Sequence, residues 1–326
     1  MRAPSFWYKE KSILSLLLLP LSIIWLLLSY FKNTLRKKYS FSKPIICVGN
    51  AVAGGSGKTP LVIEMCKYYR KRNINVHVVY KAYKVNLVAK VIKIDNNTEI
   101  NQAEDEALLI SNYAPTWLCK KRKDGINFAI SKGAKLIILD DGLQDMSIEK
   151  TINILVANKL QGNGNFKVIP AGPLREPISN SQRKSHCIFF YGNQKSFSKQ
   201  FFNYKKPVFF GNQSVTKESI NKIKNNKVLG FAGIAYPDNF FSLIENNGLN
   251  LVEKIYYPDH YIYSSYDIKM ILQKANNNQA LALTTYKDYV KIPKNLKKNF
   301  SILDIYIKFD NEKFFNFIDE KIKFSV

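Results

Sequence analysis

The chain has 326 residues, of which 46% are hydrophobic and 13% aromatic, so it can bury sizeable cores and is not a disordered polymer. The formal net charge of +24 indicates an anionic partner, although part of this excess follows a general richness in Lys, Asn, Ile and Tyr. The four cysteines lie far apart, which excludes a Cys-x-x-Cys metal or redox pair, and the lack of zinc-finger spacing or a basic recognition helix disfavours nucleic acid as the partner.

The first segment is strongly apolar, because the stretch from Ser12 to Phe31 contains no charged residue. Its twenty residues, at 1.5 Å each, match the hydrocarbon core of a bilayer, so we predict an N-terminal membrane helix in which Pro20 is tolerated as a kink. The basic flank Arg36-Lys37-Lys38 suits anionic headgroups, and residues 1–38 are therefore expected to form a single-span or monotopic anchor. A buried core helix is the alternative, whereas a cleaved signal peptide is disfavoured because no small-x-small cleavage site follows.

Beyond the anchor, strand-like apolar runs alternate with helix-like segments. This alternation predicts an α/β fold with a mostly parallel sheet and helices on both faces, as in P-loop NTPases. We expect a P-loop lobe over residues 39–190 and a smaller second α/β lobe over residues 191–326. The expected strands cover residues 44–48, 76–80, 136–140, 152–156, 227–231 and 281–285, and the expected helices cover residues 58–71, 103–113 and 237–246.

A glycine-rich turn follows the first of these strands and opens the first of these helices. In a P-loop, backbone N–H groups surround the phosphates, the Lys bridges the β- and γ-phosphates, and the Thr hydroxyl ligates Mg²⁺. Val52 stands where the usual pattern has its first Gly, and a turn that merely caps a helix is the alternative. The order of strand, Gly-Lys-Thr and helix favours a nucleotide site, in which Lys58 also acts catalytically. The predicted nucleotide-binding residues are Gly54, Gly55, Ser56, Gly57, Lys58 and Thr59.

A second apolar run, Leu136 to Leu139, ends in Asp140-Asp141-Gly142. A buried strand that carries a carboxylate at its tip can hold Mg²⁺ beside the P-loop hydroxyl. By itself such an ending is more often a turn, but the P-loop upstream favours a metal site made of Thr59, Asp140 and Asp141.

Taken together, these motifs resemble the tetraacyldisaccharide 4'-kinases of lipid A biosynthesis, and the resemblance spans nearly the whole chain. Asp-Asp-Gly-Leu-Gln and Pro-Ala-Gly-Pro-Leu-Arg-Glu are its most specific parts. The matching segments, in order, are Val48-Gly49-Asn50, Gly54 to Pro60, Glu104 to Ala107, Asp140 to Gln144, Pro170 to Glu176, Phe231 to Ile234 with Pro237, Asp259-His260-Tyr261, and Thr285 with Lys287-Asp288.

The resemblance implies an enzyme that uses ATP and Mg²⁺ to phosphorylate the 4' hydroxyl of a lipid A disaccharide 1-phosphate precursor. It also implies a location on the inner (cytoplasmic) membrane surface with the catalytic part facing the cytosol, where ATP is found. Neither nucleic acid nor an obligate protein partner is expected.

Residue by residue, the resemblance implies Asp105 as the base for the hydroxyl proton and His260 as its helper from the second lobe. Three further residues are candidates for the substrate and phosphate site: Arg175 to neutralise phosphate, Glu176 to support metal or nucleotide, and Arg122 to contact the substrate's phosphate. Without the resemblance, Asp105 is interpreted as an acid at a helix start, His260 as part of a turn, and Arg175 and Glu176 as loop ion pairs. For Arg122, the run from Lys120 to Lys123 leaves the register of the match ambiguous.

Departures from the family pattern leave other readings open. The usual His after Asp-Asp-Gly-Leu-Gln is Asp145 here, and Lys81 and Tyr286 also differ from the family, as does Glu104. The alternatives are a membrane-anchored P-loop nucleotide hydrolase or switch that acts on a protein partner, and a catalytically silent lipid-binding descendant. Asn158-Lys159-Leu160-Gln161 begins like a guanine-reading motif but lacks its Asp, which disfavours a GTPase.

Overall fold

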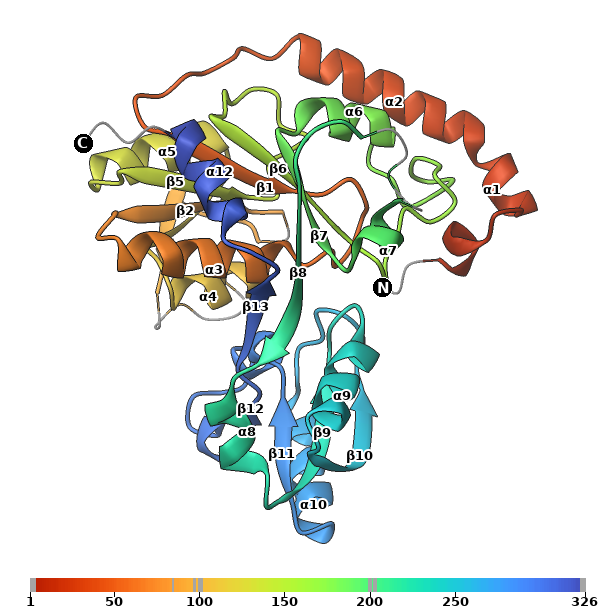
Figure 1. The fold of residues 1–326 in the computed structure, drawn as a ribbon, viewed down its shortest axis with the longest axis vertical. Coiled ribbons are helices and arrows are strands. Elements are labelled where there is room, and N and C mark those ends of the chain that lie inside the picture. Colours follow the sequence, from red (N-terminus) through yellow and green to blue (C-terminus); the bar gives the residue numbers. More distant parts are fainter. Residues whose placement is uncertain are drawn as a thin grey trace.

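The computed structural model describes residues 4–83, 85–95, 98, 102–198, 201 and 204–322. They form a larger lobe around one sheet and a smaller lobe around another, joined by two strands (Figure 1). The prediction of an α/β fold with a mostly parallel sheet is confirmed.

The larger sheet has the strand order β13-β8-β7-β6-β1-β5-β2-β4-β3. All neighbouring pairs are parallel except β13 with β8 and β3 with β4, so the antiparallel strands lie at the two edges. The central strands are buried along their whole length, because a parallel sheet is covered on both faces and its strands are runs of apolar residues. The strands are β1 (Ile45–Gly49), β2 (Val76–Lys81), β3 (Val91–Ile94), β4 (Thr116–Cys119), β5 (Leu136–Asp140), β6 (Ile152–Asn158), β7 (Cys187–Tyr191), β8 (Val208–Val215) and β13 (Ile305–Phe309).

Helices cover both faces of this sheet and enclose two apolar clusters. On one face α3 packs with the last helix, α12, whose buried Phe314 lies 5.1 Å from the ring of Phe189 on β7. On the other face α5 packs through Ile126 and Ala129. The helices of this lobe are α3 (Lys58–Lys71), α4 (Asp105–Ser111), α5 (Arg122–Ser131), α6 (Ile178–Lys184), α7 (Gln194–Ser198) and α12 (Lys313–Ile322).

The smaller sheet is entirely parallel, in the order β10-β9-β11-β12. The chain enters this lobe along β8 and returns along β13, so segments beyond residue 190 contribute to both sheets (Figure 1). Its elements are α8 (Lys217–Ile223), β9 (Lys227–Ala232), α9 (Pro237–Asn246), β10 (Asn250–Tyr256), α10 (Ser265–Asn277), β11 (Ala280–Thr284), α11 (Tyr286–Tyr289), η2 (Lys297–Asn299) and β12 (Ser301–Ile302).

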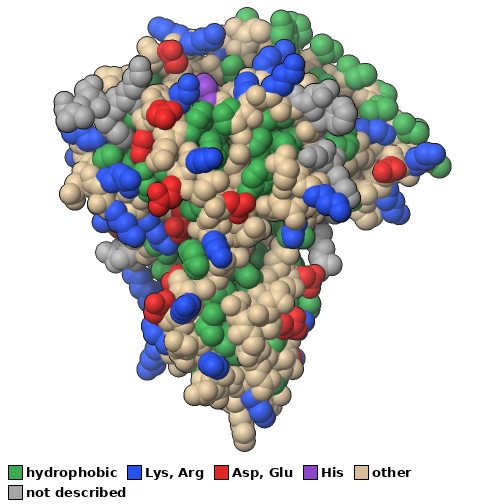
Figure 2. Space-filling model, viewed as in Figure 1, with side chains coloured by type: hydrophobic (Ala, Val, Ile, Leu, Met, Phe, Trp, Pro, Cys, Tyr) green, Lys and Arg blue, Asp and Glu red, His purple; other side chains and the backbone are tan. Residues whose placement is uncertain are grey.

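The apolar N-terminal stretch forms η1 (Ser5–Tyr8), α1 (Ile13–Leu17) and α2 (Leu19–Thr34), which lie along the rim of the larger lobe (Figure 1). The prediction of one membrane-spanning helix is not supported: within the described part of the chain, no helix is both long and apolar enough to cross a bilayer. The physical reason is that Pro20 stands in the first turn of a new helix rather than inside a continuous one. Most of the apolar side chains of α1 and α2 point outward, and Figure 2 shows hydrophobic atoms along this rim.

Candidate nucleotide and phosphoryl-transfer site

The glycine-rich turn leaves β1 and enters α3 at the carboxyl edge of the sheet, the edge at which open α/β sheets bind ligands. Gly54 and Gly57 have φ of +109° and +89°, a backbone conformation that residues other than Gly rarely adopt. A Cβ on Gly57 would also lie 2.6 Å from the Tyr191 ring, and Tyr191 donates a hydrogen bond to the Gly57 carbonyl at 2.8 Å. The backbone of the turn is thus fixed, and the 14-residue helix α3 begins directly after it. The N-terminus of this helix favours a bound anion.

The P-loop lysine and threonine meet the two acids that end β5, because β5 is the neighbour of β1 in the sheet. The Thr59 hydroxyl donates to Asp140 Oδ2 at 3.3 Å. Lys58 Nζ donates to Asn50 Oδ1 at 3.1 Å and lies 3.7 Å from Asp141 Oδ2. The sequence-predicted group of Lys58, Thr59, Asp140 and Asp141 is therefore brought together.

The two acids have opposite electrostatic surroundings. Burial raises the pKa of Asp140 to about 7, with Lys58 opposing the effect. Burial acts on Asp141 as well, but the charges of Lys58 and Arg175 outweigh it and hold its pKa well below the ordinary value. The Asp141 backbone has φ of +58°, an uncommon conformation that turns this residue away from the strand direction.

The oxygen donors beside Thr59 fit a hard divalent cation. Asp140 Oδ1 is buried and, among the described residues, has no hydrogen-bond partner, and the same holds for the Ser56 hydroxyl. Unsatisfied buried oxygens are costly, and carboxylate and hydroxyl oxygens are the ligands that Mg²⁺ takes. Asp141 is instead engaged by Arg175, whose Nη1 lies 2.6 Å from its Oδ1.

The other two phosphate candidates are tied into ion pairs of their own. Buried Arg122 donates to Asp145 Oδ2 at 2.9 Å, to the Tyr83 hydroxyl at 3.1 Å and to the Asp141 carbonyl. Glu176 accepts from Ser181 at 2.9 Å and pairs with a lysine of α6. Asp145, at the position of the usual family His, thus serves to fix Arg122.

Asp105 and His260 come together across the two lobes, although 155 residues separate them. His260 Nδ1 lies 2.9 Å from Asp105 Oδ1 and 2.8 Å from Oδ2. His260 has φ of +60° and its N–H donates to the Gly233 carbonyl at 3.2 Å, so a strained turn aims the imidazole at the larger lobe. Burial opposes ionisation of Asp105, but the hydrogen bond from His260 and the charge of Lys287 lower its pKa well below the ordinary value.

Sequence reasoning assigned no role to two lysines that complete this cluster. Lys287 Nζ lies 3.0 Å from Glu106, 3.4 Å from Asp259 and 3.6 Å from Asp105. Lys291 is buried and lies 3.8 Å from Asp105 Oδ2. Lys287 lies in the short helix α11 and Lys291 in the turn that follows it, so no helical spacing in the sequence marks the two as a pair.

Glu106 connects the cluster to the P-loop side of the site. Burial raises its pKa, and the charge of neighbouring Asp105 adds to the effect. The charge of Glu106 in turn contributes to the raised pKa of Asp140, so the two clusters lie within electrostatic range of each other. Contact between the lobes also extends to the loop itself, because a Cβ on Gly55 would lie 2.9 Å from Cβ of Ala235.

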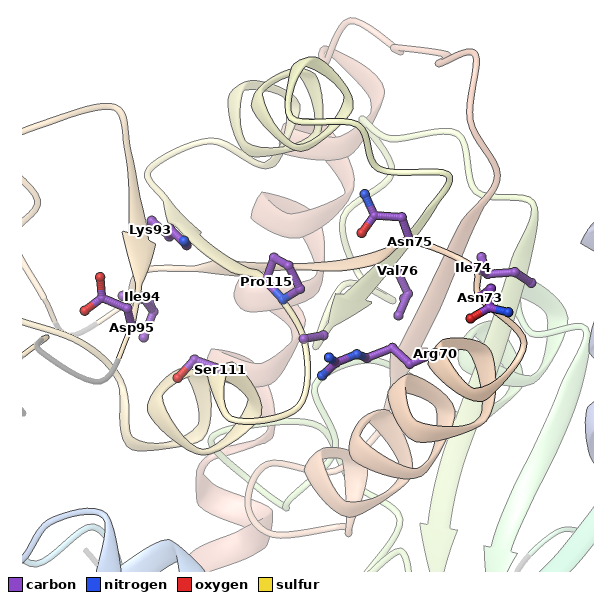
Figure 3. Close-up of a pocket in the computed structure, with 11 residues that line it drawn as sticks. Arg70, Asn73, Ile74, Asn75, Val76, Lys93, Ile94, Asp95, Ser111 and Pro115 are labelled. Carbon is purple, nitrogen blue, oxygen red and sulfur yellow. The ribbon is translucent and has the colours of Figure 1, made fainter.

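A separate cavity of about 540 Å³ lies at the opposite edge of the sheet, where β2 begins (Figure 3). Arg70, Lys93 and Asp95 line it, and none of the predicted site residues does. Because ligands of open α/β sheets bind at the carboxyl edge of the strands, the candidate site is the one at the P-loop.

The fold and the site define a class: an α/β protein with a P-loop nucleotide site, closed by a second lobe that carries an imidazole to a carboxylate. The sequence profile of the tetraacyldisaccharide-1-P 4'-kinase family matches residues 14–323, and the chain belongs to this family. The suspected resemblance is therefore confirmed.

Similar proteins agree with this assignment. Tetraacyldisaccharide 4'-kinases of Rhodospirillum centenum and Paramagnetospirillum magneticum are 30% and 32% identical to the chain. Those matches cover 95% of this chain in both cases, and 93% and 95% of the relatives. The crystal structure of the "apo" form of LpxK from Aquifex aeolicus in complex with ATP has a TM-score of 0.79, covering 96% of this chain and 100% of that one. At 24% identity this likeness shows the fold.

Proposed function

We propose that the chain is an ATP-dependent kinase that phosphorylates the 4' hydroxyl of a lipid A disaccharide 1-phosphate precursor. Membership of the family and the names of its relatives support this activity. The observation that carries it is the pairing of a P-loop with an ionised carboxylate–imidazole pair from two lobes, which supplies both a phosphate site and a proton acceptor. A nucleotide switch acting on a protein partner is not favoured, because the family is one of lipid kinases.

The reaction forms a bond between the 4' oxygen and the γ-phosphorus of ATP and breaks the bond to the β,γ-bridging oxygen, which leaves on ADP. Phosphoryl transfer needs positioning and charge neutralisation more than covalent chemistry. Backbone N–H groups of the P-loop and Nζ of Lys58 bind the β- and γ-phosphates. Mg²⁺, when bound by Thr59 and Asp140, supplies further neutralisation of the phosphate charge.

The hydroxyl proton passes to a carboxylate oxygen of Asp105. Nδ1 of His260 contacts both oxygens of this carboxylate and thereby fixes its orientation. The low pKa keeps Asp105 ionised and ready to accept a hydrogen bond from the acceptor hydroxyl. A weak base suffices where the transition state is loose, since the proton then leaves late. Arg175, beside Asp141, is the proposed contact for substrate phosphate, and Glu176 and Arg122 support the same loop and strand ends.

For the membrane, we propose that α1 and α2 lie in the interface of the inner membrane with the catalytic part facing the cytosol. Leu17 and Leu28 on their outward faces are 71% and 63% exposed, and a basic segment around Arg36 follows. An apolar face that ends in basic residues suits an anionic headgroup surface without crossing it. This replaces the spanning helix with a monotopic attachment.

The activity is tested with γ-labelled ATP, Mg²⁺ and a lipid A disaccharide 1-phosphate in detergent micelles. Label in the lipid, lost in Lys58→Ala and Asp105→Asn but kept in Lys274→Ala, supports the proposal. Lys274 is the matched control because it pairs with Glu253 on the outside of the smaller lobe. ATP hydrolysis without labelled lipid contradicts the acceptor, and the absence of any turnover contradicts the kinase.

A further inference from the structure

The helices α1 and α2 have one buried residue each, and both are serines. Ser15 is 0% and Ser22 is 4% exposed, in a segment whose other side chains are largely apolar and face outward. A serine side chain contributes little apolar surface to packing. The buried serine of each helix is therefore significant for the hydrogen bonds of its hydroxyl.

Both hydroxyls bind one loop of the larger lobe. Ser15 Oγ donates to the carbonyl of Ala171 at 2.7 Å, and Ser22 Oγ donates to the carbonyl of Val168 at 2.8 Å. Ser22 Oγ also accepts from the N–H of Ala171 at 3.2 Å, and Asn165 Nδ2 donates to Ser15 Oγ at 3.0 Å. The carbonyls of Ala171 and Val168 also accept from Asn165 Nδ2 and from the N–H of Gly172. The serines therefore add a second bond to each carbonyl, and Ser22 Oγ accepts the bond from the Ala171 N–H.

Two tryptophans extend these contacts along the same loop. Trp7 Nε1 of η1 donates to the carbonyl of Pro170 at 2.9 Å. Trp25 Nε1 of α2 donates to the carbonyl of Arg175 at 3.2 Å. The loop is thus held from its start to the residue that contacts Asp141.

From the loop, backbone hydrogen bonds lead directly into the P-loop. The N–H of Arg175 donates to the carbonyl of Ala51, and the N–H of Ala53 donates to the carbonyl of Pro173, both at 2.8 Å. Leu174 pairs with Val52 between these two bonds. This short strand-like pairing therefore fixes the backbone that leads into the glycine turn. It also fixes the position of Arg175, whose guanidinium contacts Asp141.

We propose that Ser15 and Ser22 are positioning residues for the nucleotide site, acting through the segment 165–175. This proposal rests on the proposed nucleotide site at Lys58. The N-terminal helices then have two separate roles. Their outward faces contact the membrane, and the hydroxyls of Ser15 and Ser22 hold the loop that positions the P-loop and Arg175. Loss of the hydroxyls loosens the phosphate site without changing the apolar outward face.

The test compares inward and outward variants of the full-length protein in detergent micelles. Affinity for a fluorescent ATP analogue is titrated for wild type and for the double variant Ser15→Ala/Ser22→Ala, and binding to vesicles of phosphatidylethanolamine and phosphatidylglycerol is measured by sedimentation. A hydrogen bond is worth about a factor of five, so the double variant should lose at least tenfold in nucleotide affinity while its vesicle binding stays unchanged. The matched outward variant Leu17→Ser/Leu28→Ser should lose vesicle binding and keep its nucleotide affinity.

Two further variants separate positioning from general destabilisation. Ser22→Thr keeps a hydroxyl and should restore most of the affinity lost in Ser22→Ala. Trp25→Phe removes the bond to the Arg175 carbonyl together with part of the indole ring, and should weaken nucleotide binding about threefold to fivefold. It decides the matter should the double variant fail to fold. Unchanged nucleotide affinity in the double variant, or in Trp25→Phe if that is the variant that folds, overturns the proposal. Absence of nucleotide binding in the wild type, or its indifference to Lys58→Ala, overturns the proposed function instead.

Discussion

Replacement of Lys287 by Met should move the loss of activity on the acid side to higher pH. Its ammonium lies between three carboxylates, those of Asp105, Glu106 and Asp259, at 3.6, 3.0 and 3.4 Å. Met keeps most of the apolar stem of the side chain and removes the ammonium group, with its charge and its hydrogen-bond donors. Among the described groups facing Asp105 and Glu106, the more distant ammonium of Lys291 and the imidazole of His260 then remain.

The size of the effect follows from the distances. An opposite charge within about 4–6 Å lowers a carboxyl pKa by about 1–3 units, so its removal raises the pKa by the same amount. Burial already raises the pKa of Glu106, and without Lys287 the pair Asp105–Glu106 should take up a shared proton about 1–3 units higher in pH. Protonation removes the acceptor for the hydroxyl proton, so activity is lost as the pH falls and is recovered as it rises.

The assay is a pH profile of kcat/KM for lipid phosphorylation by wild type, Lys287→Met and the control Lys274→Met. The acid limb of Lys287→Met should move up by about 1–3 units, with at least tenfold loss at the acid end, while Lys274→Met follows the wild type. An equal loss at every pH would refute the reasoning, because it would mean that Lys287 acts on docking or on phosphate rather than on carboxylate protonation.

Three other predictions concern the loop, the metal and the core. Gly57→Ala places a side chain at φ of +89° and 2.6 Å from the Tyr191 ring, so it should raise the KM for ATP at least tenfold, and an unchanged KM would contradict the P-loop geometry. Since the pKa of Asp140 is raised to about 7, protons compete with Mg²⁺ below that pH, and the half-saturating Mg²⁺ concentration should rise about tenfold per unit there but show no such slope in Asp140→Asn. Phe314→Ala should lower the free energy of unfolding by about 3–5 kcal/mol in urea titrations, whereas Tyr266→Ala at a 76% exposed position should change it by less than about 0.5 kcal/mol; similar effects would mean that α12 is not part of the main core.

The sequence determined the local features well. Strand, glycine turn and helix around Lys58 are adjacent in the chain, so the P-loop is readable without any knowledge of packing. The same holds for the buried strand that ends at Asp140, because an unbroken apolar run reports burial on both faces. Strands at the sheet edges and those built on aromatic residues, such as β4 and β7, were not predicted, since short apolar runs do not distinguish strand from helix.

Only the tertiary structure decided which charges meet. Asp105 and His260 are 155 residues apart, and their pairing depends on how β8 and β13 set the smaller lobe against the larger one. Lys287 acquires its three carboxylate partners from the same arrangement, which no local pattern contains.

The N-terminal segment shows the same division. Hydropathy sums a window of residues and correctly reports an apolar segment, but it does not distinguish a helix that crosses a bilayer from one that lies along a protein. That choice was made by the start of a new helix at Leu19, with Pro20 in its first turn, and by the hydroxyls of Ser15 and Ser22, which bind the loop 165–175. The physical reason is that composition fixes how much surface a segment must hide from water, whereas hydrogen-bond partners distant in the chain fix where it lies.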